Sequence, residues 1–132
     1  SPASDTSTDA DASEMLDPDT VEMLRAMASS NQSGMLEELI DILESQSADL
    51  INEITEALSR NDAKTVQRAA HTLKGSALNL GAKMLADAYF AVEIAADEER
   101  LDDIPGSLAA ARSVFERTLP VLRATYRRTT SQ

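Results

Sequence analysis

The sequence of 132 residues contains no cysteine, no tryptophan and only one histidine. Without cysteine, the chain forms no disulfide, binds no metal through thiolates, and has neither a thiol nucleophile nor a redox pair. Aromatic residues make up 3% of the chain, so a surface that stacks nucleic-acid bases is not expected. No apolar run approaches the roughly 18 residues of a membrane span, and the N-terminus lacks the features of a signal peptide. The sequence therefore predicts a cytoplasmic segment without membrane contact.

Basic residues are also scarce, since 12 Lys and Arg face 23 Asp and Glu, which gives a formal net charge of -11 at pH 7. Nucleic-acid binding depends on neutralising phosphates with Lys and Arg, so we expect no nucleic-acid partner. The charge is uneven, however, because residues 60–83 are basic apart from one acid, Asp62. This segment would attract an anionic group or an acidic partner. Its basic residues are Arg60, Lys64, Arg68, Lys74 and Lys83.

The chain divides into a polar segment and one domain of ordinary size. Residues 1–16 are mostly Ser, Asp, Thr and Ala, and we expect them to form a disordered linker because they have little to bury. Residues 17–129 are expected to form the domain. The linker and the start of the sequence at Ser1 suggest a segment of a longer protein.

From residue 17 onward, apolar residues recur at helical spacing, and little favours strands. Asp17 and Pro18 predict the start of a short helix with Val21, Leu24 and Met27 on its apolar face. Longer helices are expected over about 33–58, 63–80 and 82–96, and from about 101 or 104 to 126. A kink or break is expected in the last helix, because it contains Pro120. The pattern predicts an all-α, antiparallel up-down four-helix bundle with a short additional N-terminal helix across one end.

The single histidine, His71, lies near the middle of the predicted helix 63–80, on its polar side. At about 100° per residue, the apolar residues of this helix form one stripe, and His71 projects away from it. A lone histidine in such a place is most often simply solvated, so its neighbours decide whether it has a function. The apolar stripe consists of Val66, Ala69, Ala70, Leu73, Ala77 and Leu80.

Several kinds of site are disfavoured around this histidine. Metal-binding carboxylate bundles use Glu-x-x-His pairs, whereas Arg68 stands three residues before His71. No candidate exists for the nucleophile and oxyanion hole of a hydrolase, and the glycines are too widely spaced for a phosphate loop. We therefore expect no metal, no cofactor and no self-contained enzyme activity. A solvated imidazole can still accept a group from a partner as a nucleophile.

Two residues one turn after His71 favour such a role. Lys74 lies on the next turn of the helix and would stabilise the negative oxygens of an attached phosphoryl group. Gly75 costs about 1 kcal/mol relative to alanine in mid-helix, which suggests that a partner approaches closely there. A basic cluster can merely solubilise a surface, and a glycine can merely permit helix packing. Gly75, however, faces away from the apolar stripe, where packing would not require it.

The run from Ala70 to Ala82, AHTLKGSALNLGA, resembles the signature of histidine-containing phosphotransfer (HPt) domains. Lysine follows the histidine by three residues and glycine by four, a small residue comes next, and a second glycine closes the helix. The resemblance extends over about residues 18–128. It implies a phosphorelay intermediate rather than an enzyme, in which His71 takes a phosphoryl group from a receiver-domain aspartate and passes it to another receiver domain.

By position, the resemblance implies that His71 is phosphorylated, that Lys74 is its charge partner and that Gly75 is a docking gap. The implied partners are response-regulator receiver domains, which would supply magnesium, and a sensor histidine kinase, on the same parent chain or separate. The segment is expected to be a monomer. The alternative hypothesis is a helical adaptor that binds a receiver or another acidic partner without taking phosphate. In either case, the partner-binding surface would include Lys64, Gln67, Arg68, Ser76, Leu78 and Asn79.

Overall fold

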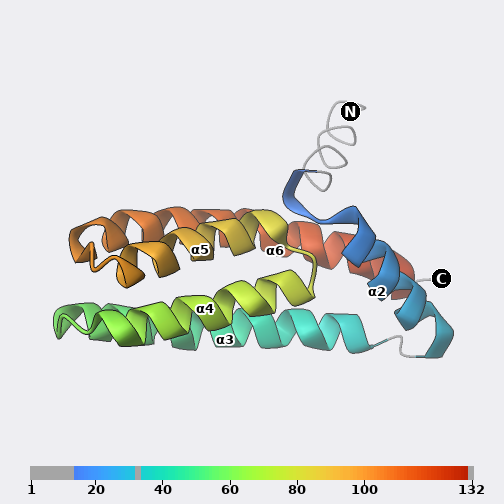
Figure 1. Ribbon diagram of the computed structural model, residues 1–132. Helices are drawn as coiled ribbons and strands as arrows, with labels where there is room; N and C mark the ends of the chain where they lie inside the picture. The colour runs from blue at the N-terminus through green and yellow to red at the C-terminus, as the bar shows by residue number, and fades with distance from the viewer. Residues whose placement is uncertain (1–13, 32–33, 131–132) are drawn as a thin grey trace.

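The computed structural model describes residues 14–31 and 34–130, and this part of the chain is helical and contains no strand (Figure 1). The turns between α3 and α4 and between α5 and α6 lie at one end of the molecule, and the turn between α4 and α5 lies toward the other end, which α2 occupies. Neighbouring long helices are therefore antiparallel, and the predicted four-helix bundle with a short N-terminal helix is confirmed. The elements are α2 (Pro18–Asn31), α3 (Met35–Ser59), α4 (Ala63–Asn79), α5 (Lys83–Asp97), the 3-10 turn η1 (Leu101–Asp103) and α6 (Ile104–Thr130).

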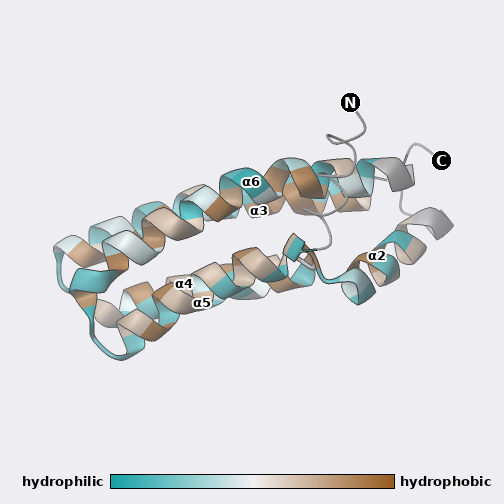
Figure 2. Cartoon of the chain, turned by 90° about the horizontal axis from the view of Figure 1, so that it is seen from above, coloured by the Kyte–Doolittle hydropathy of each residue, from teal (hydrophilic) through white to brown (hydrophobic). Residues whose placement is uncertain are grey.

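The core lies between the four long helices. Hydrophobic and hydrophilic residues alternate along each helix, as Figure 2 shows, so that each helix has one apolar side to bury. Burying one large aliphatic side chain contributes about 1.5–3 kcal/mol, so this shared core is the main source of stability. None of the described helices is apolar over enough length to cross a membrane. Fully buried members of the core include Leu36, Ile40, Ile54, Leu73, Leu85, Tyr89, Ile104, Leu122 and Tyr126.

Aspartates cap α2 and α4 where the sequence predicts helix starts. The Asp17 carboxylate accepts hydrogen bonds from the Asp19 amide at 3.2 Å and the Thr20 hydroxyl at 2.8 Å. The Asp62 carboxylate accepts from the Thr65 amide at 3.2 Å and the Thr65 hydroxyl at 2.6 Å. These bonds satisfy donors that the first turn of a helix leaves unpaired, and they fix the residue at which α4 begins.

Contacts from both α2 and α6 hold the turn between α4 and α5. Gly81 has a φ of +74°, as expected for a residue that closes a helix, and a Cβ there would lie 3.2 Å from the Thr20 Cβ. The Gly81 carbonyl accepts a hydrogen bond from the Asp17 amide at 2.7 Å. The Leu80 carbonyl accepts one from the buried Tyr126 hydroxyl at 2.8 Å. The C-terminal end of α4 is thereby fixed relative to the rest of the bundle.

The predicted end of the polar linker is wrong. Met15 and Leu16, which the sequence interpretation assigns to a disordered segment, are 1% and 2% exposed and belong to the core. The hydrogen bond from the Asp17 amide to Gly81 anchors this segment beside the α4–α5 turn, where both side chains can be buried. Residues 1–13, the rest of the predicted linker, lie outside the described residues.

The predicted break at Pro120 does not occur, because α6 continues through this residue to Thr130. Pro120 is exposed, so its ring lies on the solvent side of the helix. Ala111 before it and Leu122 after it are both fully buried. Packing on both sides of the proline holds the two halves of α6 in the bundle despite the hydrogen bond that proline removes.

The predicted apolar face of α2 is also partly wrong. Leu24 is buried, but Met27 is 51% exposed, and the neighbouring Ala28 takes the core position at 3% exposure. The helix lies at the end of the bundle (Figure 1), where it has fewer neighbours to cover its apolar side chains.

Candidate functional site

His71 lies on the solvent side of α4, and its side chain is 65% exposed. The preceding residue, Ala70, is fully buried, and so is Leu73 on the same turn. The buried stripe of α4 therefore lies on the other side of the helix, as the hydropathy pattern predicts. The imidazole is accessible to another molecule.

The imidazole contacts a carboxylate from the neighbouring helix, Glu93 of α5. The His71 Nδ1 atom lies 2.9 Å from the Glu93 Oε2 atom. An ionised carboxylate can only accept a hydrogen bond, so Nδ1 must donate it. In the neutral ring the lone pair then lies on Nε2, which has no hydrogen-bond partner within the part of the chain that the structure describes. The contact with Glu93 therefore leaves Nε2 as the nucleophilic nitrogen.

The same carboxylate also binds Lys74. The Lys74 Nζ atom lies 3.1 Å from the Glu93 Oε1 atom and 4.6 Å from the centroid of the Phe90 ring, which is within the range of a cation–π interaction. The side chains of Lys74 and Glu93 are only 23% and 12% exposed. Salt screens a partly buried pair less than a fully exposed one. One glutamate thus holds the imidazole and the ammonium next to each other.

Gly75 leaves open space beside the imidazole. A Cβ built at this position would meet no atom within 4 Å, so packing within the described chain does not require a glycine here. Leu78 follows one turn later and is 50% exposed. Residues 71, 75 and 78 are spaced to lie along one line of the helix surface. Another molecule could therefore approach the backbone of α4 beside His71 and contact Leu78.

Other residues of the predicted surface lie toward the start of α4. Lys64 and Arg68 are exposed and continue the line of His71 toward the N-terminal end of the helix. Gln67 is half-buried and lies on the side of α5, where Lys64, Gln67 and Asp97 line a shallow hollow. Lys64 therefore has an acidic neighbour from α5.

Ser76 and Asn79 lie on the opposite side of α4, toward α3. The Ser76 hydroxyl donates a hydrogen bond to the side-chain carbonyl of Gln46 in α3. Asn79 is exposed and lines a shallow groove that Ile42 of α3 also lines. The exposed members of the predicted site are therefore Lys64, Arg68, His71, Leu78 and Asn79. Of the partly buried members, Gln67 and Lys74 turn toward α5 and Ser76 turns toward α3.

Sequence reasoning did not find Glu93 or Phe90. The two residues are three apart on α5 and therefore share a side of that helix. A sequence predicts that α5 is helical but does not show which of its sides meets α4. One signal was available, because Phe90 is a large apolar residue outside the buried stripe of α5 and is 43% exposed.

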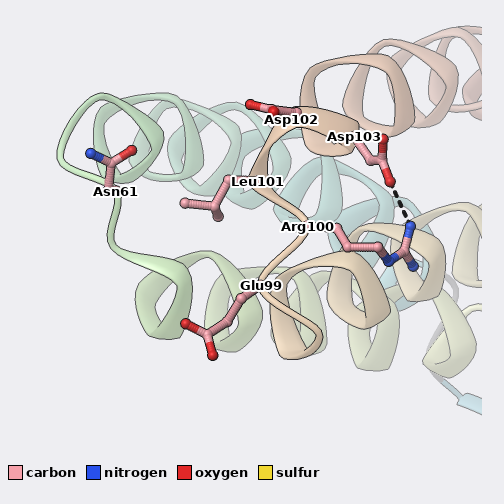
Figure 3. A pocket seen from close by; sticks show the side chains of 6 residues that line it. All are labelled: Asn61, Glu99, Arg100, Leu101, Asp102 and Asp103. Atoms are coloured by element: carbon pink, nitrogen blue, oxygen red, sulfur yellow. Dashed lines mark hydrogen bonds and ion pairs between the residues drawn. The ribbon is translucent and has the colours of Figure 1, made fainter.

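A separate hollow lies at the end of the bundle that contains the α3–α4 turn (Figure 3). Arg100, which lines this hollow, forms ion pairs of 2.7 Å with Asp103 and 2.8 Å with Glu98. Asn61 lies in the turn before α4, roughly 15 Å along the helix axis from His71. Within residues 14–31 and 34–130, no group of His, Cys, Asp and Glu side chains is placed to hold a metal ion. The hollow is lined by Asn61, Glu99, Arg100, Leu101, Asp102 and Asp103.

Comparison with protein families identifies the class to which this fold and site belong. The family model of the Hpt domain matches residues 38–125, and the chain is a member of this family. Hpt domains are histidine phosphotransfer carriers of phosphorelays rather than conventional enzymes.

A solved structure shares the fold. The crystal structure of histidine-containing phosphotransfer protein B (HptB) from Pseudomonas aeruginosa PAO1 superimposes with a TM-score of 0.66 and covers 89% of this chain and 95% of that one. Its sequence is 21% identical, so the likeness concerns the fold. A search of curated proteins found no significant match.

Proposed function

We propose that this protein is a phosphorelay intermediate whose His71 accepts a phosphoryl group from the phosphoaspartate of one receiver domain and passes it to the aspartate of another. The observation that carries the proposal is the exposed imidazole whose Nδ1 is bound by Glu93. In this arrangement the neutral ring carries its lone pair on Nε2, and the ring is accessible to another molecule. Membership of the Hpt family supports the same role.

In the transfer step, the Nε2 lone pair of His71 attacks the phosphorus of the receiver's acyl phosphate. The new N–P bond forms while the bond between phosphorus and the aspartate oxygen breaks, and the aspartate leaves with that electron pair as a carboxylate. The ring, which keeps its Nδ1 proton, becomes an N-phosphorylated imidazolium. Glu93, 2.9 Å from Nδ1, stabilises the positive charge that the ring gains. Transfer to the second receiver reverses these bond changes.

Lys74 and Gly75 have separate roles in this proposal. The Lys74 ammonium, which lies on the Glu93 side of the imidazole, stabilises the negative oxygens of the attached phosphoryl group. Gly75 leaves room for the receiver to bring its aspartate close to α4, because no side chain projects there. Leu78 and the exposed polar residues along α4 contact the rest of the receiver surface.

The partner domains supply the catalytic groups for phosphoryl transfer. This chain supplies a nucleophile and a charge environment, whereas the magnesium ion and the acidic pocket are expected on the receiver domain. A sensor histidine kinase, on the same parent chain or on another, starts the relay. We propose that the segment works as a monomer in which α4 and α5 of one chain supply the residues of the site.

Transfer from a panel of receiver domains carrying radiolabelled phosphoaspartate tests the proposal. We expect acid-labile, alkali-stable label on this chain, and none on His71→Gln, because the chain has no other histidine. Thr72→Ala changes the exposed neighbour of His71 and should keep the label. Circular dichroism confirms that both variants remain helical.

Two outcomes would contradict this function. Label that survives in His71→Gln would show that another residue is modified. Receivers that bind the unmodified chain but never label it would instead favour the adaptor hypothesis, in which α4 recognises a partner without chemistry.

A further inference from the structure

We infer that Phe90 is a positioning residue for Lys74, and that its ring holds the ammonium beside the imidazole without neutralising it. The inference rests on the proposed phosphorylation of His71. It adds a residue of α5 that acts on the site through its contact with Lys74.

The geometry places Lys74 between two side chains of one helix turn. Its Nζ atom lies 4.6 Å from the Phe90 ring centroid and 3.1 Å from the Glu93 Oε1 atom. Phe90 and Glu93 are three residues apart on α5, so they project from the same side toward α4. A single turn of α5 thus supplies the ammonium with a negative partner and an aromatic surface.

The Glu93 carboxylate depends on this ammonium for its charge balance. Its Oε1 atom is shielded from solvent and has no hydrogen bond, so the ion pair with Lys74 is its compensating contact in the described structure. An unpaired buried charge is costly, and the lysine is therefore held near the carboxylate. Phe90 replaces water beside the ammonium and further restricts the long, flexible lysine side chain.

The two partners of Lys74 differ in what they leave available for a phosphoryl group. A carboxylate competes with the phosphoryl oxygens for the ammonium, because both are anions. A phenyl ring attracts the cation through its quadrupole but carries no net charge, so it does not compete as an ion. Phe90 therefore keeps Lys74 close to His71 without adding a second anion that competes for the ammonium. The entropy of ordering the lysine is lost before phosphorylation rather than during it.

An exposed aromatic beside the site could instead serve only as a contact for the receiver. A measurement without any receiver separates the two roles. Phosphoramidate, a small phosphoryl donor, can phosphorylate the imidazole directly, and the chain has a single histidine to label. The subsequent rate of phosphoryl loss in buffer then depends on this chain alone.

We expect phosphorylated Phe90→Leu to lose its phosphoryl group about two- to five-fold faster than the unmodified protein. In the metaphosphate-like transition state, the phosphoryl group carries less negative charge than in the phosphohistidine, so a nearby cation stabilises the starting state more. Phe90→Tyr retains an aromatic ring and should restore the slow rate. Lys74→Gln should accelerate the loss of the phosphoryl group at least as much as Phe90→Leu does. The double variant, with both substitutions, should lose the group no faster than Lys74→Gln alone.

A spectroscopic signature accompanies the kinetic effect. The side-chain proton resonances of Lys74 should be shifted by the ring current of Phe90, lose that shift in Phe90→Leu and retain it in Phe90→Tyr. Phe115→Leu is the matched control, since Phe115 lines a hollow between α3 and α6 and should change neither measurement.

Unchanged rates and resonances in Phe90→Leu would overturn the inference, as would an acceleration that persists in full without Lys74. These results are distinct from a failure of the proposed function. If phosphoramidate labels His71 but no receiver does, the relay role fails, whereas the rates of phosphoryl loss still test the positioning role of Phe90. If receivers label His71 and the Phe90→Leu rates are unchanged, only the positioning role fails.

Discussion

At the residue scale, the electrostatics of the site depend on Glu93, because its two oxygens contact the imidazole and the ammonium separately. The basic segment seen in the sequence is therefore not a free cationic patch at this point. Lys74 is already paired in the unphosphorylated protein, and a phosphoryl group must share the lysine with the carboxylate. Such a pair orients both partners before the reaction, which is how preorganised sites stabilise developing charge.

Gly75 allows stability to be separated from docking. Gly75→Ala should stabilise the fold by about 0.5–1 kcal/mol, because alanine is the better helix former and its Cβ meets open space. Urea denaturation measures this change. Gly75→Gln should also fold, but it should slow transfer from a receiver on the order of 10- to 100-fold, because its side chain occupies the gap beside His71. Transfer by Gly75→Gln at the unmodified rate would contradict the docking role.

At the element scale, α4 owes its starting residue to Asp62 and its end to Gly81. Hydrogen bonds from Thr65, together with nearby arginines, hold the pKa of the Asp62 carboxyl below its ordinary value of 3.8. The cap sets where the helix begins and therefore which of its residues face solvent. Because His71 lies near the middle of α4, neither end of the helix has to distort to expose it.

The Asp62 cap predicts a sensitivity to acid. Because its pKa is lower in the folded chain than in the unfolded one, its contribution is present above pH 3.8 and is lost as the pH falls through the folded value. Asp62→Ala should therefore be less stable at neutral pH, and the difference from the unmodified protein should narrow below about pH 4. Thermal unfolding over a pH series measures this.

Thr65→Val provides the control for this prediction. It removes the hydroxyl donor and keeps the amide, so it should weaken the pH dependence without abolishing it. A difference between Asp62→Ala and the unmodified protein that stays constant from neutral pH to pH 3 would exclude the proposed role of the carboxylate.

The elements also show which predictions a sequence supports. The helix starts at Asp17 and Asp62 and the turn at Gly81 depend on local hydrogen bonds and backbone conformation, so they were predictable. The solvent-facing side of α4 follows from the spacing of its apolar residues. Pro120 shows the opposite case, because a local preference for a break was outweighed by core packing on both sides. Local rules are reliable where no tertiary contact opposes them.

At the scale of the whole molecule, the two ends of the bundle are closed in different ways. Near the α4–α5 turn, the Tyr126 hydroxyl of α6 reaches the Leu80 carbonyl, and the Asp17 amide reaches Gly81. At the other end, charged side chains around Arg100 surround an open hollow (Figure 3). Hydrogen bonds from Tyr126 and Asp17 therefore fix the end of the bundle at which α4 passes into α5.

Burial raises the pKa of Tyr126 to about 12, which makes the fold sensitive to alkali. The folded state favours the neutral phenol, so its contribution is present below pH 10.0 and is lost as the pH rises toward 12. Tyr126→Phe should cost about 1–2 kcal/mol at neutral pH, because the Leu80 carbonyl loses its donor, and it should reduce the alkaline loss of stability.

Urea denaturation from pH 7 to pH 11 checks this prediction. Part of the alkaline loss should remain in Tyr126→Phe, because burial also raises the pKa of Tyr89. Equal stability of Tyr126→Phe and the unmodified protein at neutral pH would show that the buried hydrogen bond is not needed to close this end.

The sequence by itself determined the helices, the solvent-facing side of α4 and the candidate residues His71, Lys74 and Gly75, because periodicity, capping and spacing along one helix are local properties. Only the tertiary structure decided what lies opposite them. Glu93 and Phe90 reach the site because α5 packs against α4 with one particular side, and that orientation depends on the shape of the whole core. For the same reason, the apolar pair at the end of the predicted linker could be assigned to the core only once the chain was folded.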